Sequence, residues 1–357
     1  MTVTLAQQSR LRFGFQLTAI DDSGKQAGAL TPNDGNTQIQ FNNVGGNQRQ
    51  YINHTSSGSN PVSPGQGSWT FKWTAPAQSA GRVTFYISGN AANGNFTTSG
   101  DTIYTRSDSL QPAPALSNLA SVSAASFAPT GPLAANSIVA GFGINLATNT
   151  AGASSLPLPT LLGGAEVRVR DAGGAERPSG MFFASSGQLN YLIPAGTANG
   201  VATIIVRREG VDTAQGTATI DTLAPGLFTA NSSGQGVAAA VILRRRGTVD
   251  TFELVAQLNQ TSGRFEPILL DLGPEGDQVF LLAFGTGFRN VNAQTTATAT
   301  IGGTSAPVIF VGAAGAGEGL DQANITIPRS LIGRNMALDV IFTVGGKTAN
   351  TVQIGVK

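Results

Sequence analysis

Short apolar runs separated by chain breakers are the feature that most limits the folds open to this chain. Runs of four to eight residues rich in Val, Ile, Thr and Phe recur from end to end, each bounded by Gly, Asn, Ser or Pro. The 46 glycines and 17 prolines interrupt the sequence too often for long helices. Runs of this kind are typical of strands in antiparallel sandwiches. The predicted fold class is therefore all-β, built from tandem antiparallel β-sandwiches.

One polar pattern occurs twice in the second part of the chain. Gln188, Asn190 and Pro194 recur with the same spacing as Gln322, Asn324 and Pro328. Each copy follows a Phe-Gly turn and a glycine pair, which are Phe142-Gly143 with Gly163-Gly164, and Phe284-Gly285 with Gly302-Gly303. Such a repeat indicates a duplicated β-module. Because no catalytic motif lies inside the repeat, the repeat favours a structural or binding role over catalysis.

The composition changes at SDSLQPAPALSN, residues 107–118. Two X-Pro steps there favour extended backbone and a semi-rigid spacer. The predicted domains are one sandwich in residues 1–111, a second in 112–224 and a third in 225–357. The segment from 223 to 272 predicts a hairpin extension of the third domain.

Alternating aromatic residues mark two strands of the first domain. Trp69, Phe71 and Trp73 share one face of a strand, and Val83, Phe85 and Ile87 share one face of the next. We expect the two strands to form a hairpin joined by APAQSAG. Its aromatic face must then be covered by a second sheet.

Several separated phrases of the first domain carry a resemblance to a known family. They are RFGFQLTAID, HTSSG, SWTFKWTAPA, FYISGNAANGN and SGDTIYT. In this order they resemble a reeler-like domain, a sandwich found at the front of some extracellular matrix proteins and bacterial secreted proteins. In that family one or more strands normally precede the segment equivalent to TVTLAQQSRLRFGF. Here the chain begins almost inside that segment, so the resemblance implies an incomplete sandwich.

The remainder, from residue 116 to 357, carries a second set of phrases. They include NSIVAGFGINLA, SGQLNYLIPAG, LAPGLFTANSSGQGVAAA, FGTGFR and GLDQANITIP. In this order they resemble a C-terminal module family of secreted bacterial proteins to which no biochemical activity is assigned. Its halves look like the Ig-like repeats of plexins and some transcription factors. The resemblance implies tandem Ig-like and reeler-like sandwiches in an elongated array.

Location and partners follow from composition. Low Lys with abundant Thr, Asn, Gly and Ser is typical of bacterial surface and secreted proteins, so we expect an extracellular or cell-surface protein whose leader was removed. The formal net charge is +1, so no attraction to nucleic acid is expected. No run reaches the ~18 apolar residues of a transmembrane segment. The triplet Arg244–Arg246 alternates between strand faces, which predicts a solvated hairpin or pairing with carboxylates.

Catalytic signals are weak. The single histidine, His54, has Ser56 and Asp101 as distant candidate partners for a triad, but no GxSxG elbow is present. We expect an imidazole bonded to backbone or to Asn, and a protein that is not an enzyme. With one His and no Cys, the chain lacks the usual ligands for a transition-metal site. Nucleotide binding is not expected, because no phosphate-loop motif lies between a strand and a helix.

Calcium is the one cofactor left open, because oxygen ligands suffice for it. The candidate sets are Asp21 and Asp22 with Asn33 and Asp34, and Asn90, Asn93 and Asn95 with Asp101. Neither set matches a known calcium motif, and the same residues make ordinary turns. Turns are the favoured interpretation. Within each pair, Gln188 with Asn190 and Gln322 with Asn324, the two side chains share one face of a strand. We expect them to hydrogen-bond a neighbouring loop or to contact a glycan.

The leading functional hypothesis is an extracellular structural or adhesive protein that assembles with itself. A sandwich lacking one strand can accept a strand from a neighbour, giving filaments or a surface layer. The predicted assembly interface consists of Thr2, Val3, Thr4 and Leu5 at one end and Val352, Ile354 and Val356 at the other. The alternative is a monomeric glycan- or surface-binding module of a secreted system.

Overall fold

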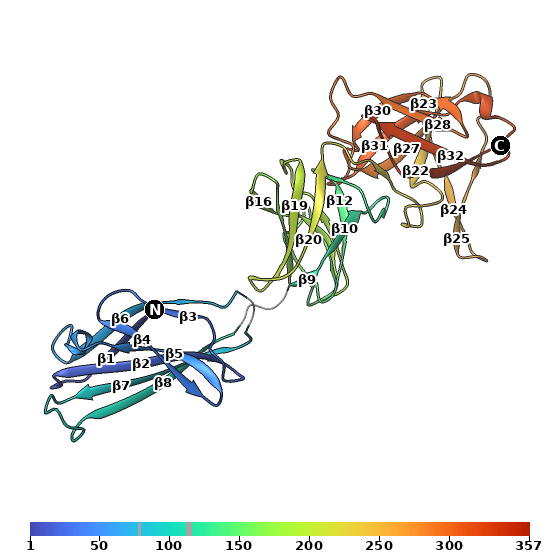
Figure 1. Ribbon diagram of the computed structural model, residues 1–357. Helices are drawn as coiled ribbons and strands as arrows, with labels where there is room; N and C mark the ends of the chain where they lie inside the picture. Colours follow the sequence, from blue (N-terminus) through green and yellow to red (C-terminus); the bar gives the residue numbers. More distant parts are fainter. Residues whose placement is uncertain (78–79, 112–115) are drawn as a thin grey trace. The chain divides into compact units, whose positions relative to one another are not determined.

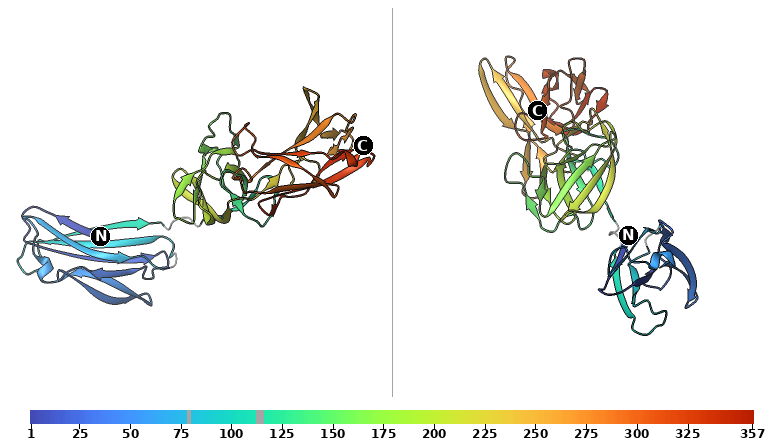
Figure 2. Two further views of the ribbon diagram at one scale, coloured as in Figure 1. Left: turned by 90° about the horizontal axis from the view of Figure 1, so that it is seen from above. Right: turned by 90° about the vertical axis from the view of Figure 1, so that its left-hand side faces the viewer.

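The computed structural model describes residues 1–77, 80–111 and 116–357. They belong to two compact units, Met1–Pro114 and Ala115–Lys357 (Figure 1). Strands make up both units in every view, and the helices of the described residues are two short 3-10 turns, Ser57–Ser59 and Arg329–Leu331 (Figure 2). The all-β fold class is confirmed.

The N-terminal unit is a sandwich of a three-stranded sheet, in the order β1-β6-β3, and a five-stranded sheet, in the order β4-β5-β2-β7-β8. The strands are β1 (Thr2–Ala6), β2 (Arg12–Asp21), β3 (Ala29–Pro32), β4 (Thr37–Val44), β5 (Asn47–His54), β6 (Gln66–Thr74), β7 (Val83–Ala92) and β8 (Thr102–Leu110). Alternation in β2 defines its two faces. Phe13, Phe15 and Leu17 are buried in the core, whereas Arg12 and Gln16 are exposed on the outer face.

The hairpin predicted for β6 and β7 is wrong. β6 pairs with β1 and β3, whereas β7 pairs with β2 and β8, so the two strands lie in opposite sheets. The connection from Thr74 to Val83 is long enough to cross the ~10 Å between stacked sheets. The aromatic faces therefore cover each other: the Trp73 and Phe85 rings are 5.0 Å apart and the Phe15 and Trp69 rings 4.6 Å apart.

The predicted spacer is shorter than residues 107–118. Residues 107–110 continue β8, and β9 begins at Ser117. The two X-Pro steps, and the predicted boundary after residue 111, fall at residues 112–115, which lie outside the described part of the chain.

The C-terminal unit contains two hydrophobic cores, one drawn from residues 119–220 and one from 223–356. Two sheets surround the first core. One is five-stranded, in the order β10-β12-β18-β17-β13. The other is seven-stranded, with the path β11-β20-β19-β15-β14 and with β9 paired to β20 and β16 paired to β15. Their bounds are β9 (Ser117–Asn118), β10 (Ala120–Ser123), β11 (Leu133–Ala134), β12 (Ile138–Phe142), β13 (Ala151–Gly152), β14 (Leu161–Leu162), β15 (Ala165–Arg170), β16 (Glu176–Pro178), β17 (Met181–Ala184), β18 (Gln188–Leu192), β19 (Gly200–Arg208) and β20 (Val211–Asp221).

Around the second core lie two six-stranded sheets, with the paths β23-β22-β27-β31-β30 and β26-β34-β32-β28-β29. Their strands, with the side strands β21 and β33, are β21 (Gly226–Leu227), β22 (Ala240–Arg246), β23 (Val249–Leu254), β26 (Leu269–Leu270), β27 (Gln278–Thr286), β28 (Ala297–Ile301), β29 (Thr304–Ala306), β30 (Val308–Ala313), β31 (Asp321–Thr326), β32 (Met336–Val344), β33 (Lys347–Thr348) and β34 (Val352–Val356). The predicted hairpin extension is present as the β22–β23 hairpin and a separate ribbon of β24 (Ala256–Asn259) and β25 (Arg264–Pro267).

The sequence repeat corresponds to equivalent strands. Gln188 of β18 lies opposite Phe142, and Gln322 of β31 lies opposite Phe284. The glycine pairs form turns with almost the same backbone, with φ of 59° and 79° in the first copy and 55° and 78° in the second. In both copies, the strand that pairs with the Gln-Asn strand has a register shift: β17 next to β18, and β30 next to β31. The two C-terminal sandwiches are therefore copies of one design.

Candidate functional site

An open cleft lies along one side of the N-terminal sandwich, between β1 of one sheet and β8 of the other. It has a volume of about 460 Å3 and is lined by Thr2, Val3, Thr4 and Leu5, by Tyr104, Thr105, Arg106 and Asp108, and by Phe15, Ile87 and Gly89. Phe15 belongs to the hydrophobic core and Ile87 packs against it. The cleft is thus an opening between the sheets that leads to the core, and the predicted N-terminal residues form one of its walls.

The backbone of β1 is paired on one side only. β1 is the end strand of its sheet, next to β6. Met1 and Phe71 exchange backbone hydrogen bonds, of 2.8 and 3.1 Å, and Gln7 N donates to Gly65 O at 2.8 Å. In an antiparallel ladder, alternate residues point their N–H and C=O groups to the same side. Thr2, Thr4 and Ala6 therefore direct these groups away from β6, to a free edge.

The side chains of β1 suit an edge that accepts a strand. Val3 and Leu5 pack against the core, and the Thr4 hydroxyl lies 3.3 Å from that of Ser68 on the opposite face. The edge of β8 is different, because Arg106 and Asp108 face the cleft as an ion pair of 2.9 Å. Charged residues that point inward are a common protection against strand addition. Of the two edges that border the cleft, β1 is the unprotected one.

One end of the cleft is closed by side chains. Tyr104 donates its hydroxyl proton to Gln7 Oε1 at 3.2 Å, and Gln7 Nε2 donates to Thr102 Oγ1 at 3.3 Å. These bonds join the two sheets beyond the end of β1. The opening is therefore confined to the length of Thr2–Ala6.

The C-terminal set of predicted interface residues lies elsewhere. Val352, Ile354 and Val356 are 0% exposed and belong to the core of the third sandwich. β34 pairs with β32 on one side, and with β26 and the bridge from Val237 on the other. In this folded chain β34 offers no free edge, whereas β1 is an end strand of its sheet.

His54 is bonded to backbone, as predicted. Its Nδ1 accepts the Phe15 N–H at 3.1 Å. Asp101 accepts hydrogen bonds from Asn90 Nδ2 and Asn93 N, and the carbonyl of Ser56 accepts one from Ser59. The His54 ring and the Asp101 carboxylate thus have other partners, and Ser56 is bonded through its backbone carbonyl.

The first set of calcium candidates forms turns, whereas in the second set Asn90 lies in β7 and, with Asn93, donates to Asp101. Asp21 Oδ1 accepts bonds from the Ser23 hydroxyl, the Ser23 N–H and the Lys25 N–H, and the Ser23 bond lowers the pKa of the Asp21 carboxyl. Asp22 pairs with Arg82, and Asp34 accepts the Asn36 N–H. Asn33 belongs to the same turn region. Within residues 1–77, 80–111 and 116–357, no three His, Asp or Glu side chains gather as a cation site.

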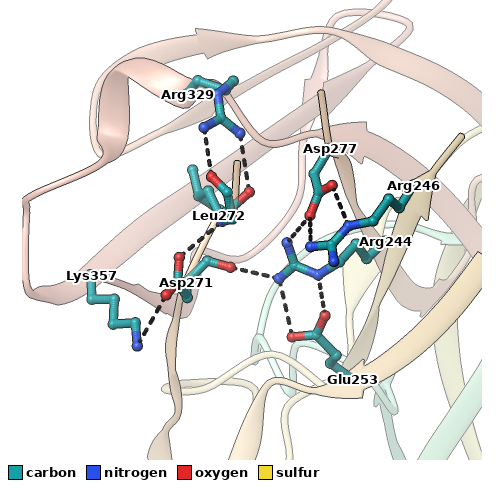
Figure 3. A network of polar contacts seen from close by, with 9 residues as sticks. Arg244, Arg246, Glu253, Asp271, Leu272, Asp277, Arg329 and Lys357 are labelled. Carbon is teal, nitrogen blue, oxygen red and sulfur yellow. Dashed lines mark hydrogen bonds and ion pairs between the residues drawn. The ribbon is translucent and has the colours of Figure 1, made fainter. Parts of the chain in front are cut away.

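The three consecutive arginines are paired with carboxylates. Arg246 binds Asp277 through two bonds of 2.8 and 2.7 Å, and Arg244 binds Glu253 at 2.6 Å and Asp277 at 3.2 Å (Figure 3). Arg245 points to the other face and pairs with Asp250 at 2.7 Å. The prediction of carboxylate pairing and alternating faces is confirmed.

The same network holds the end of the chain. Arg244 donates to the Asp271 carbonyl at 2.6 Å, and the Lys357 ammonium lies 3.4 Å from the Asp271 carboxylate (Figure 3). Arg329 donates to the carbonyls of Leu272 and Gly273. This cluster therefore anchors the segment around β26, which holds β34 in place.

The repeated amides bond within each pair. Gln188 Nε2 donates to Asn190 Oδ1 at 2.8 Å, and Gln322 Nε2 donates to Asn324 Oδ1 at 2.6 Å. The first pair also borders a cavity of about 560 Å3 lined by phenylalanines, among them Phe142. In each pair, the Gln amide donor and the Asn amide acceptor therefore satisfy each other on one face of the sheet.

No protein-family model matches the chain, and no curated protein matches it. Among solved structures, it is similar to the full extracellular region of plexin A4, domains 1 to 10, with 11% identity and a TM-score of 0.20. The alignment covers 97% of this chain and 30% of that one, so the chain spans less than a third of that structure's length. The reeler-like and Ig-like resemblances stay predictions. Among the described residues, no helix has the length and apolar character to cross a membrane.

Proposed function

We propose that this is an extracellular structural or adhesive protein whose chains join by adding a β-strand at the free edge of β1. The observation that carries the proposal is the cleft between β1 and β8, where unpaired backbone lies beside core side chains. A strand placed there gains main-chain hydrogen bonds to Thr2, Thr4 and Ala6. Its alternate side chains cover Phe15 and Ile87.

We propose β23 of a second copy as the donor. β23 is the end strand of its sheet, and Phe252 and Leu254, two residues apart, are each 67% exposed. Residues at this spacing share one strand face, so both side chains can turn toward the cleft. Joining β23 to β1 is a heterologous contact, which repeats from copy to copy and builds an open filament. The proposal assigns no catalytic step to the chain.

The test compares the wild-type chain with Thr4→Pro by sedimentation velocity and negative-stain electron microscopy. Proline removes the N–H that points to the free edge and leaves the bonds of Val3, Leu5 and Gln7 to β6 in place. We expect concentration-dependent filaments for the wild type and monomers for Thr4→Pro. Thr4→Ala is the matched control, because it removes the same hydroxyl and keeps the amide, and it should assemble like the wild type.

Two results would overturn the proposal. One is a wild-type chain that stays monomeric at every concentration. The other is a Thr4→Pro chain that assembles as well as the wild type while its circular dichroism shows an intact fold. A monomeric wild type would favour the surface-binding alternative.

A further inference from the structure

The outer face of the five-stranded sheet in the N-terminal unit forms a polar groove. Two hollows, of about 880 and 440 Å3, share Gln16 of β2 and Ser88 of β7 as lining residues. This face is turned away from the core, so its side chains do not pack between the two sheets. Each hollow has the volume of a typical ligand-binding cleft, and the two lie side by side on the same sheet face.

Buried polar atoms in this groove lack partners. Asn53 and Thr18 are 7% and 6% exposed, and neither Asn53 Oδ1 nor Thr18 Oγ1 has a hydrogen-bond partner in the described chain. Asn53 lines the larger hollow and Thr18 the smaller. Buried polar atoms are nearly always paired, and an unpaired one destabilises the fold. Their position in one groove indicates partners that come from a ligand.

Asn90 supports the same conclusion. Its Nδ2 donates to Asp101 Oδ2 at 3.1 Å, which identifies the nitrogen and the oxygen of the amide because a carboxylate only accepts. Asn90 Oδ1 is then an acceptor, and it too has no partner in the described chain. The terminal torsion of an Asn side chain is broad, so small rotations turn such oxygens toward a ligand.

An aromatic side chain stands at the rim of the larger hollow. Phe96 is 99% exposed and has a φ of 62°, a backbone conformation that is unusual for a bulky residue. Its loop is braced by side chains: Asn93 Oδ1 accepts the Asn95 N–H, Asn95 Oδ1 accepts the Thr97 N–H, and Asn93 Nδ2 donates to Ser99 O. Strained backbone held by surrounding bonds is characteristic of binding sites. An exposed ring beside a groove offers an apolar platform.

The chemistry of the lining selects the ligand class. Gln16, Gln38 and Gln40 are exposed in or beside the groove, and each amide both donates and accepts, as sugar hydroxyls do. Three charged side chains line the hollows: Arg12 donates to Ser59 and Asn60, Asp101 accepts from Asn90 and Asn93, and Arg106 pairs with Asp108. The described lining contains only Arg12 and Arg106 as cations, and Arg106 is ion-paired, so the groove has no cluster of cations to attract phosphates or acidic polymers. The groove therefore suits an uncharged, hydroxyl-rich chain.

We propose that this groove binds a neutral glycan, with Phe96 stacking on a sugar ring and Asn53, Asn90 and Thr18 bonding its hydroxyls. The site lies on the outer face of the sheet, whereas the β1 cleft opens between the sheets. The groove and the cleft share border residues such as Ile87 and Arg106, but the residues proposed to bind the glycan do not line the cleft. An assembled filament would present the groove many times.

The experiment uses a microarray of neutral and acidic oligosaccharides, followed by calorimetric titration with the strongest neutral probe. It is run on the wild-type chain and on Thr4→Pro, so that binding is measured whether or not the chains assemble. Phe96→Ala should weaken binding by roughly tenfold or more. Phe41→Ala is the matched control, because Phe41 is also exposed, at 61%, and does not line the groove.

Asn53→Leu separates a binding role from a structural one. Replacing an unpaired buried amide by an apolar side chain of similar size should raise the Tm by roughly 4 °C or more, while glycan affinity falls. Absence of binding to any neutral probe overturns the proposal. So does binding only to acidic probes, or neutral-glycan binding that Phe96→Ala and Asn53→Leu leave unchanged.

Discussion

Asp277 lets Arg244 and Arg246 share one face of a hairpin without repelling each other. Its side chain is 1% exposed and lies between Arg244 and Arg246. The hydrogen bonds from Arg246, followed by those from Arg244, lower the pKa of Asp277 to about 2. The carboxylate therefore stays ionised under nearly all conditions in which the protein is folded.

A pH dependence follows from this shift. Because the pKa of Asp277 is lower in the folded chain than the ordinary value of 3.8, its stabilising effect is complete above about pH 4 and is lost as the pH falls toward 2. We expect the melting temperature of the C-terminal unit to fall over this range. Asp277→Asn should lower the melting temperature at pH 7 and flatten the dependence between pH 4 and 2, as followed by circular dichroism.

Asp250→Asn is the control for this experiment. Asp250 pairs with Arg245, but both side chains are well exposed, at 39% and 47%. Exposed ion pairs contribute little. An equal loss in both variants would contradict the role given to Asp277.

The duplicated glycine turns provide a second test with single residues. Gly164 and Gly303 occupy equivalent positions, with φ of 79° and 78°. A Cβ on Gly303 meets open space, whereas one on Gly164 lies 2.0 Å from Thr148 Oγ1. Gly303→Ala should cost only the backbone penalty of about 1–2 kcal/mol. Gly164→Ala should cost more in urea unfolding, and equal losses would contradict the crowding of Gly164 by Thr148.

At the scale of the strand, β1 has two different edges. The amides of Val3, Leu5 and Gln7 face β6, and those of Thr2, Thr4 and Ala6 face outward. In dilute, monomeric protein we expect hydrogen exchange to be slow at the first set and fast at the second. Assembly should slow exchange at Thr2, Thr4 and Ala6. Uniform protection of β1 in the monomer would contradict the free edge.

The strands themselves could be predicted from sequence, because alternation is a local signal. Trp69 and Phe71 are buried as their spacing predicts, and the Gln-Asn repeat marks equivalent strands. Sheet partners are a long-range property, so alternation could not show that β6 and β7 lie in opposite sheets. For the same reason the sequence predicted Val352, Ile354 and Val356 as part of an available interface, although β26 and β32 pair with both edges of their strand.

The polar groove could not be predicted from the sequence. Phe96 lies in a stretch of Asn, Gly, Thr and Ser without periodicity, so nothing local marks it as an exposed ring at a cavity. The absent partners of Asn53 and Thr18 become visible only when every neighbouring strand is in place. The aromatic residues that the sequence did mark, such as Trp69, serve the core instead.

At the scale of the whole molecule, low net charge favours association. The formal charge of +1 means that copies repel each other only weakly. Main-chain hydrogen bonds and apolar contacts at β1 depend little on ionic strength. We therefore expect the concentration at which assembly begins to change by less than about threefold between 0.05 and 0.5 M NaCl. A much steeper dependence, measured by light scattering, would indicate an interface of charged groups.

Electron cryomicroscopy of the assembled wild-type chain tests the central claim most directly. The account predicts a filament in which a strand of one copy continues the β1-β6-β3 sheet of the next, bonded to Thr2, Thr4 and Ala6. Filaments in which that edge remains open to solvent, or a chain that never assembles, would contradict it.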